Sequence, residues 1–367
     1  MAKRRDGERG MKASGTVKDE PRTRSARKST GAAGSDRHAA RGEQGARRNR
    51  ELQADAERKE KKTQQKQGGN GKAKQEAVQA GARTYPSPPM PRQHQAKPGA
   101  EREMTPRPRY EAPMYRGSGK LRGMVALVTG GDSGIGRGVA VLYAREGADV
   151  AIVYLNEHDD ARETQRAVEA EGRKGILIPG DVTDPQFCRD AVQRTVQELG
   201  KLDVLVNNAA FQQHAERLED ISDEQWDRTF RTNIYGYFYM ARAALPHLGN
   251  GASIVNSGSV TGMRGQKSLL DYSSTKGAIH AFTKSLAQSV VDRGIRVNCV
   301  APGPVWTPLN PADKPANEVA GFGKGVAMGR PAQPEELAPA YVFLAAPSDS
   351  SYITGEILPV LGGGEGG

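Results

Sequence analysis

The sequence predicts an α/β protein built on a doubly wound parallel sheet, and three observations support this fold class. Short, almost wholly apolar runs recur along residues 123–367, as expected of strands that are buried on both faces of a parallel sheet. Amphipathic stretches of helical length separate these runs, so strand and helix alternate. The first 120 residues follow neither pattern. We therefore expect a single folded domain that carries a long N-terminal extension.

Each expected element follows from the local pattern of apolar residues. The seven apolar runs predict strands at residues 124–128, 149–155, 175–179, 202–206, 252–256, 295–300 and 356–360. The amphipathic stretches predict helices that end near residue 146, cover 159–172 and 184–200, lie within 216–248, and begin at 272. The carboxyl ends of parallel strands lie at one edge of the sheet, where ligands are expected to bind.

Residues 1–83 are expected to form a disordered basic tail. They contain no aromatic and few β-branched side chains, so they cannot bury enough apolar surface to offset the entropy of ordering. Polar helix formers at residues 51–66 favour transient helix there. Residues 84–122 are rich in proline, which predicts an extended arm along a surface of the same subunit or of a partner subunit.

The positive charge of the chain belongs to this extension. Residues 1–120 carry 30 Lys and Arg against 14 Asp and Glu, whereas the remainder carries 23 against 29. A flexible basic tail predicts nonspecific, salt-dependent binding to nucleic-acid phosphates, and without aromatic residues it predicts no base stacking. The alternatives are a solvated tail that binds no partner and a start codon assigned too far upstream.

Composition excludes several other classes of protein. Two cysteines, Cys188 and Cys299, form no disulfide framework, and the six histidines lack the spacing of metal ligands, so no metal is expected. No apolar segment approaches the roughly 20 residues of a membrane-spanning helix. The N-terminus also lacks the apolar region of a signal peptide. These features predict a cytoplasmic protein that does not bind membranes.

A cluster of glycines follows the first expected strand, from Thr129 to Gly136 (TGGDSGIG). Glycine permits a tight turn and lets the backbone approach a pyrophosphate, which then lies at the positive end of the following helix. This position between a strand and a helix predicts a Rossmann-type dinucleotide site. An acid at the end of the second strand selects NAD, and a base selects NADP. Tyr154 stands there and is neither an acid nor a base, so this position does not decide between NAD and NADP.

Tyr272 and Lys276 are four residues apart at the start of an expected helix, so they share one face of it. The pKa of tyrosine is ordinarily about 10, too high for efficient acid–base catalysis at neutral pH, and a neighbouring cation lowers it. Ser259 follows the fifth expected strand, at the edge where ligands bind, and its hydroxyl can hold a substrate oxygen.

The order and spacing of these motifs resemble the classical short-chain dehydrogenase/reductase family over about residues 123–363. The resemblance implies four catalytic residues, which are Asn233, Ser259, Tyr272 and Lys276. It also implies a site for NAD or NADP that consists of Gly130, Asp132, Ser133, Gly134, Ile135, Gly136, Asp181, Val182, Asn208, Ala209, Tyr272, Lys276, Pro302, Gly303 and Thr307. One departure is Ala210, where the family has glycine. The end of the arm, residues 115–121, further resembles the glucose dehydrogenase-like and aldehyde reductase branch.

The resemblance implies an NAD(P)-dependent oxidoreductase that transfers a hydride between nicotinamide and a small aldehyde, ketone, sugar-like carbonyl or alcohol. Ser259 and Tyr272 would hold the substrate oxygen, Tyr272 would transfer the proton, Lys276 would lower the pKa of Tyr272, and Asn233 would position a water. The composition of residues 308–330 suits a mobile lid over the substrate. Family members are commonly homotetramers. A nucleotide-binding regulator without turnover is the alternative, and the complete catalytic set argues against it.

Overall fold

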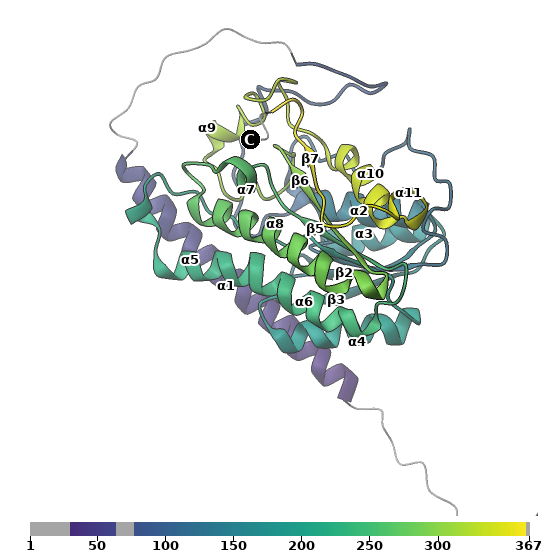
Figure 1. The fold of residues 1–367 in the computed structure, drawn as a ribbon. Coiled ribbons are helices and arrows are strands. Elements are labelled where there is room, and N and C mark those ends of the chain that lie inside the picture. Colours follow the sequence, from purple (N-terminus) through teal and green to yellow (C-terminus); the bar gives the residue numbers. More distant parts are fainter. Residues whose placement is uncertain (1–29, 64–76, 365–367) are drawn as a thin grey trace, which may run out of the picture.

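A parallel sheet forms the centre of the fold. The computed structural model describes residues 30–63 and 77–364. Within these residues the seven strands run in the order β3-β2-β1-β4-β5-β6-β7 (Figure 1). They are β1 (Val125–Thr129), β2 (Asp149–Tyr154), β3 (Gly175–Pro179), β4 (Val204–Asn207), β5 (Ser253–Ser257), β6 (Arg296–Pro302) and β7 (Ile357–Val360). The predicted doubly wound sheet is confirmed, and its order reverses between β1 and β4, where such folds bind ligands.

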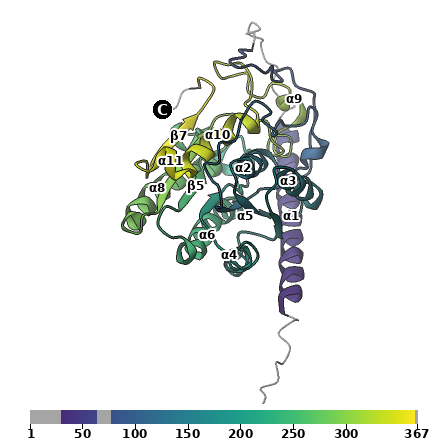
Figure 2. The same cartoon turned by 90° about the vertical axis from the view of Figure 1, so that its right-hand side faces the viewer.

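Helices cover both faces of the sheet (Figures 1 and 2). Ala126 and Val128 of β1 point to one layer of helices, and Leu127 points to the other, as the alternation of side chains along a strand requires. The first layer contains α2 (Gly134–Arg145), α3 (His158–Ala170) and α10 (Pro334–Ala345). The second contains α4 (Pro185–Leu199), α6 (Gly236–Ala244) and α8 (Leu270–Val290).

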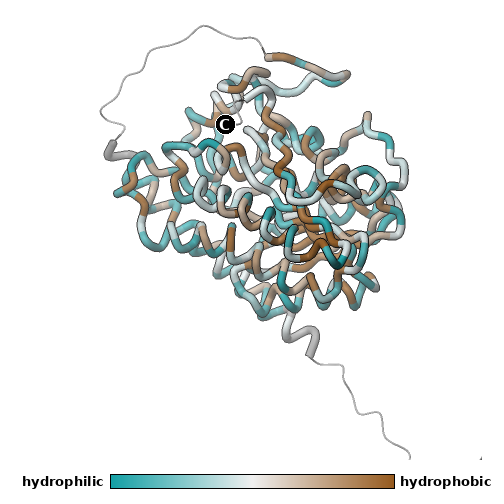
Figure 3. Tube along the Cα trace, in the orientation of Figure 1, coloured by the Kyte–Doolittle hydropathy of each residue, from teal (hydrophilic) through white to brown (hydrophobic). Residues whose placement is uncertain are grey.

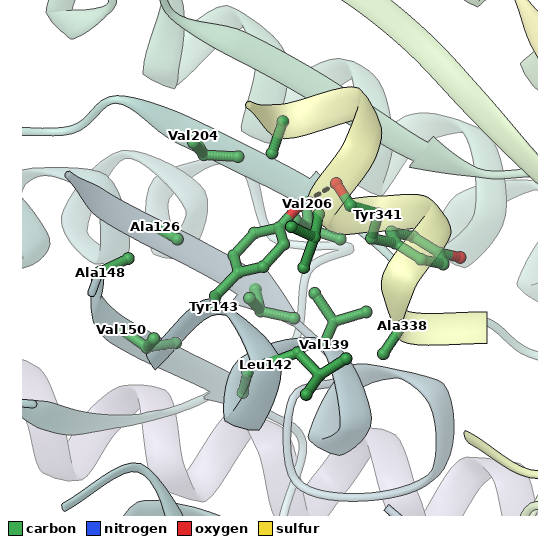
Figure 4. Close-up of a cluster of buried hydrophobic side chains, with 14 of the residues drawn as sticks. Ala126, Val139, Leu142, Tyr143, Ala148, Val150, Val204, Val206, Ala338 and Tyr341 are labelled. Atoms are coloured by element: carbon green, nitrogen blue, oxygen red, sulfur yellow. Dashed lines mark hydrogen bonds between the residues drawn. The ribbon is translucent and has the colours of Figure 1, made fainter. Parts of the chain in front are cut away.

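Tyr143 lies at the centre of the first layer (Figure 4). Its ring is fully buried among aliphatic side chains, and its hydroxyl donates a hydrogen bond to the carbonyl of Tyr341 at 3.1 Å. The buried polar atom is therefore satisfied. Figure 3 shows hydrophobic residues concentrated along the sheet, with hydrophilic residues on the outer sides of the helices.

Shorter helices connect these elements. They are η2 (Glu101–Glu103), η3 (Leu218–Asp220), α5 (Asp223–Phe230), η4 (Arg231–Tyr235), η5 (Leu245–His247), α7 (Thr261–Arg264), η6 (Val291–Arg293), α9 (Ala316–Val319) and α11 (Pro347–Ser350). Of these, η4 is a π-helical turn that joins α5 to α6, and such turns are frequent at functional sites. None of the helices in the described ranges combines the length and the apolar character that crossing a bilayer requires.

The proline-rich arm of residues 84–122 lies along its own subunit and is extended apart from η2. Backbone hydrogen bonds attach it to the rest of the domain at separate points. Gln95 N donates to the carbonyl of Pro311 at 2.9 Å, and Leu121 N donates to the carbonyl of Glu146 at 3.0 Å. The arm therefore connects the loop after β6 with the start of the sheet.

The N-terminal extension contains a helix, α1 (Thr30–Thr63), that lies beside the ends of β2 and β3 (Figures 1 and 2). The expectation of disorder over residues 1–83 is therefore wrong for 30–63, while 1–29 and 64–76 lie outside the described residues. The inward side of α1 carries no apolar stripe. Its buried residues are small or carry amides: Gly42, Gly45, Ala46, Asn49 and Gln53. A helix that docks in this way leaves no apolar period in the sequence.

Arg137 ties the arm to α2 through buried charges. Its guanidinium is fully buried and lies 2.7 Å from the carboxylate of Glu101 in the arm. The other carboxylate oxygen of Glu101 accepts a hydrogen bond from Gly134 N at 2.5 Å. Arg137 also donates to the carbonyl of Asp132 at 3.0 Å and lies over the ring of Tyr110. The arm thus supplies one of three carboxylates near this buried arginine, and Asp160 and Glu163 of α3 supply the others at 3.6 and 3.2 Å.

Replacing Arg137 with alanine is expected to lower the free energy of unfolding by about 3–5 kcal/mol, because the buried Glu101 loses its partner. Urea denaturation measures this difference. Arg166→Ala is the control, since Arg166 is exposed on α3 and is expected to change the unfolding free energy by less than about 0.5 kcal/mol. Equal urea midpoints for the two variants would show that the buried pair does not stabilise the fold.

Candidate active site

A cavity of about 710 Å³ lies at the carboxyl ends of the strands. Its wall includes residues that directly follow five strands, namely Gly130, Leu155, Asn208, Gly258 and Gly303. This is the crevice at the point where the strand order reverses, as the sequence predicts. Its volume lies within the range of ligand pockets, about 300–1,000 Å³.

The glycine turn closes tightly because its glycines have no side chains. A Cβ on Gly136 would overlap the carbonyl oxygen of Gly130 and would lie 2.8 Å from Nδ2 of Asn208. Asn208 Nδ2 donates to the carbonyls of Thr129 and Gly130, both at 3.1 Å. The turn leads into the N-terminus of α2, whose backbone N–H groups and dipole favour an anion. The cradle therefore fits the pyrophosphate of a dinucleotide.

All but one of the predicted cofactor-binding residues lie in the cavity wall. These are Gly130, Asp132, Ser133, Gly134, Ile135, Asp181, Val182, Asn208, Ala209, Tyr272, Lys276, Pro302, Gly303 and Thr307. Gly136 is not in the wall, and its contribution is to let the turn close.

Carboxyl groups gather at the end of the cavity beside β2 and β3. Burial raises the pKa of Asp132 to about 6 and that of Glu157 to about 7. Asp181 lies 3.1 Å from the guanidinium of Arg228, which balances its charge. Tyr154, at the position expected to contact the cofactor ribose, also lines this end.

Ser259, Tyr272 and Lys276 meet in another part of the same cavity. Ser259 Oγ accepts hydrogen bonds from N and Oγ1 of Thr261, both at 3.1 Å, so its own proton is available to Tyr272 or to a bound substrate oxygen. Lys276 Nζ donates to the carbonyl of Ser257 at 2.7 Å and lies 5.3 Å from the centre of the Tyr272 ring. The predicted hydroxyl, phenol and ammonium are therefore neighbours.

Burial governs the protonation of these groups. It raises the pKa of Tyr272 above the usual value near 10, and the hydrogen bond from Ser259 only partly opposes this effect. It lowers the pKa of Lys276 to about 8. The expected lowering of the Tyr272 pKa is therefore not observed in this structure, where burial dominates. At neutral pH the site presents a protonated phenol beside a largely protonated amine.

Asn233 is set apart from the other three predicted catalytic residues. It is fully buried on η4 and does not line the cavity. Its Oδ1 accepts from Phe211 N at 2.8 Å, and its Nδ2 donates to the Phe211 carbonyl and to Thr275 Oγ1, both at 3.0 Å. Asn233 therefore joins the loop after β4 to α8.

Sequence reasoning missed a buried charged cluster that influences Tyr272. Asp313, in the predicted lid, accepts hydrogen bonds from the ring of His214 and from Gln212 Nε2, and Lys97 Nζ of the arm lies 3.6 Å from it. Although burial opposes its ionisation, the charges of His214 and Lys97 hold the pKa of Asp313 below its usual range. No motif marks this cluster, because three distant segments contribute one or two residues each.

Comparison with known families agrees with this geometry. A family model described as Enoyl-(Acyl carrier protein) reductase matches residues 130–365. The chain belongs to the classical short-chain dehydrogenase/reductase family.

Relatives from this family span the catalytic part of the chain. The oxidoreductase YhdF of Bacillus subtilis is 55% identical over 272 residues, which are 74% of this chain and 94% of YhdF. The glucose and ribitol dehydrogenase of Daucus carota is 47% identical over 279 residues, which are 74% of this chain and 96% of the carrot protein. A short chain dehydrogenase from Burkholderia cenocepacia, solved in complex with NADP, has a TM-score of 0.62 and 35% identity over 66% of this chain and 98% of its own. This short-chain dehydrogenase/reductase is therefore an NAD(P)-dependent oxidoreductase.

Replacing Gly136 with alanine is expected to raise the Kd for NADH and NADPH about tenfold or more, because the new methyl group overlaps Gly130 and opens the turn. Titration of nucleotide fluorescence measures this Kd. Gly249→Ala is the control, since Gly249 is exposed and a Cβ there meets nothing within 4 Å. Wild-type affinity in Gly136→Ala would contradict the assigned role of the turn.

Proposed function

We propose that the protein transfers a hydride between NAD(P) and the carbonyl or alcohol carbon of a small polar substrate, with Tyr272 as the acid–base group. The observation that carries this proposal is one continuous cavity that contains both the glycine turn and the Ser259–Tyr272–Lys276 group. The bound nicotinamide supplies hydride chemistry. The chain's own residues supply orientation and the proton.

In the reducing direction, Tyr272 donates its proton to the substrate carbonyl oxygen, while Ser259 donates a hydrogen bond to the same atom. Thirteen residues separate the two in sequence, and the cavity wall brings their hydroxyls together. Two donors directed at one oxygen stabilise the negative charge that develops there. In the oxidising direction the same phenol accepts the proton from the alcohol.

Lys276 supplies a fixed positive charge. The carbonyl of Ser257 holds its Nζ at 2.7 Å, and the protonated amine stabilises the phenolate that remains when Tyr272 has given up its proton. The ammonium has two further donors, which can bind the hydroxyls of the cofactor ribose. Asn233 is a positioning residue in this scheme, since its amide holds Phe211 and Thr275.

The cavity wall favours a polar substrate. Polar side chains contributed by the loop after β4, the segment before α8 and the lid include Gln212, His214, Arg264, Gln266 and Lys314. Such groups hydrogen-bond hydroxyls better than they pack against an acyl chain. The carrot relative is named for glucose and ribitol. We therefore propose small aldehydes, ketones and sugar-like compounds, with the corresponding alcohols, as the substrate class.

We also propose that the chain forms a homo-oligomer, as family members do. Trp226, Tyr235 and Phe238 are large apolar side chains that stay between 39% and 44% exposed along the helix formed by α5, η4 and α6. A group of exposed aromatic residues on one helix favours a protein–protein contact.

Tyr272→Phe is expected to lower kcat by about 10²–10⁴-fold, because the substrate oxygen loses its proton donor. NADPH affinity should change little. A panel of aldehydes, ketones, sugars and alcohols, assayed with both NADH/NAD and NADPH/NADP, identifies the substrate and measures the loss. Tyr352→Phe serves as the control, since Tyr352 is fully exposed. A near-normal rate in Tyr272→Phe would contradict the assignment of Tyr272 as the acid–base group.

Reduction is expected to slow at alkaline pH because of Lys276. The pKa of this amine is lowered to about 8, so its positive charge is present below that pH and is lost as the pH rises through it. We expect kcat/KM for reduction to be level near pH 6–7 and to fall roughly tenfold per pH unit above about 8. Ser259→Ala should lower the whole profile without moving the inflection. A profile that stays level to about pH 9.5 would contradict the role of Lys276.

A further inference from the structure

Helix α1 borders the end of the cavity beside β2 and β3, although it lies outside residues 130–365 that the family model matches. Its inward residues Gly42, Gly45, Ala46, Asn49 and Gln53 recur at helical spacing and so form one face. Figure 2 shows α1 as a long helix along one side of the molecule. The family's fold thus has an added wall at its dinucleotide site.

Two glycines allow α1 to approach this end closely. A Cβ on Gly42 would overlap the carbonyl oxygen of Leu155, the residue that follows β2. A Cβ on Gly45 would overlap the carboxylate of Asp181, which lines the cavity just after β3. Larger side chains at these two positions would therefore push the helix away from the cavity.

Asn49 is the residue of α1 that reaches the cavity wall. It is 5% exposed, and its Oδ1 accepts a hydrogen bond from Arg228 Nε at 2.7 Å. Because a guanidinium only donates, this bond fixes which way the amide points. The amide nitrogen of Asn49 donates to no residue within 30–63 or 77–364. A donor that is accessible from the cavity and has no partner in the described residues therefore borders it.

The next inward residue, Gln53, connects α1 to the arm. Its Oε1 accepts from Lys97 N at 2.8 Å, and its Nε2 donates to the carbonyl of Gln95 at 2.9 Å. The residues that follow, Pro98 and Gly99, also line the cavity. Docking of α1 thus holds a second part of the wall in place.

Little apolar surface stabilises the docked position. Among the side chains of α1 that the structure describes, Ala46 is the buried hydrophobic one. The ion pairs of Arg41 with Asp184 and of His38 with Asp190 are partly exposed, and such pairs contribute little. The docked position therefore rests mainly on polar contacts such as those of Asn49 and Gln53, and a ligand that contacts the docked helix shifts the population toward it.

We propose that α1 caps the adenosine end of the cofactor site, with the Asn49 amide donating a hydrogen bond to the adenine ring of bound NAD(P), and that the docked helix slows cofactor release. The inference rests on the proposed function, since it requires NAD(P) binding. Adenine ring nitrogens are acceptors, which matches the unpaired donor. Linkage then makes the effect reciprocal: the cofactor stabilises the docked helix as much as the helix stabilises bound cofactor.

Gly45→Leu in the full-length chain tests the cap, because the new side chain overlaps Asp181 and displaces α1. Gly34→Leu is the matched control: it makes the same exchange in the same helix, and a Cβ there meets nothing within 4 Å. Both substitutions raise helix propensity alike. Stopped-flow fluorescence measures the release of NADPH and of NADH.

Gly45→Leu is expected to release nucleotide about tenfold faster than wild type, because the displaced helix no longer covers the nucleotide or donates a hydrogen bond to it. Gly34→Leu should match wild type. If Gly45→Leu released nucleotide at the wild-type rate, or bound it more tightly, the proposal that α1 caps the site would be wrong. Failure of the wild-type protein to bind either nucleotide would instead overturn the proposed function on which the cap rests.

A second variant removes the amide without a clash at Asp181. Asn49→Leu keeps a side chain of similar size but cannot donate to adenine. α1 exposes Arg37, Arg47, Arg48 and Arg58, so trypsin reports whether it is docked. Saturating NADPH should slow cleavage within α1 several-fold in wild type and in Gly34→Leu, and much less in Asn49→Leu. Equal cleavage of wild type with and without NADPH would overturn the proposal.

Discussion

Every strand of the sheet runs in the same direction, and the site depends on this constraint. Parallel pairing brings the carboxyl ends of all strands to one edge, so residues as far apart in sequence as Gly130 and Gly303 share one cavity wall. The helices that begin there add their positive ends to the same edge. The glycine turn and the group formed by Ser259, Tyr272 and Lys276 therefore line the same cavity.

The extension adds charges to ion pairs that the sheet domain already contains, since Arg137 also lies near Asp160 and Glu163 and Asp313 also contacts His214. Glu101 reaches Arg137 behind the glycine turn, and Lys97 reaches Asp313 beneath the lid. Since an isolated buried charge is costly, each of these partners favours the arm in its bound position. Apolar packing adds to these contacts, since Met90 and Met104 of the arm form a buried cluster with Trp306 and Val319. Charge pairs and apolar packing together thus hold the arm against the turn and the segment after β6.

Periodicity and motif spacing predicted most of the fold and which side chains meet in the cavity. The second strand was expected at 149–155 and covers Asp149–Tyr154, and Ser259, Tyr272 and Lys276 are neighbours. Strands buried on both faces must be apolar, so their sequences carry a strong signal. For α1 the same methods indicated only transient helix at 51–66 and not a docked helix over Thr30–Thr63, because docking through glycines and amides leaves no apolar period.

Two other differences have physical reasons of their own. The sequence places a cation beside Tyr272, but it does not reveal the burial that raises the pKa of this tyrosine. Motif spacing likewise identifies Asn233 without revealing that its amide is engaged by Phe211 and Thr275. Both properties come from the packing of distant segments, which no local pattern encodes.

The π-turn η4 has a consequence for how this helix can vary. One extra residue in the turn rotates everything that follows by about 100° relative to a regular α-helix. α5 therefore packs against α8 while α6, in the same continuous helix, packs against α4. Loss of a single codon here would straighten the helix and rotate α6 away from its neighbour, even if every remaining side chain were kept. In this segment the length of the chain is under tighter constraint than the identity of most of its residues.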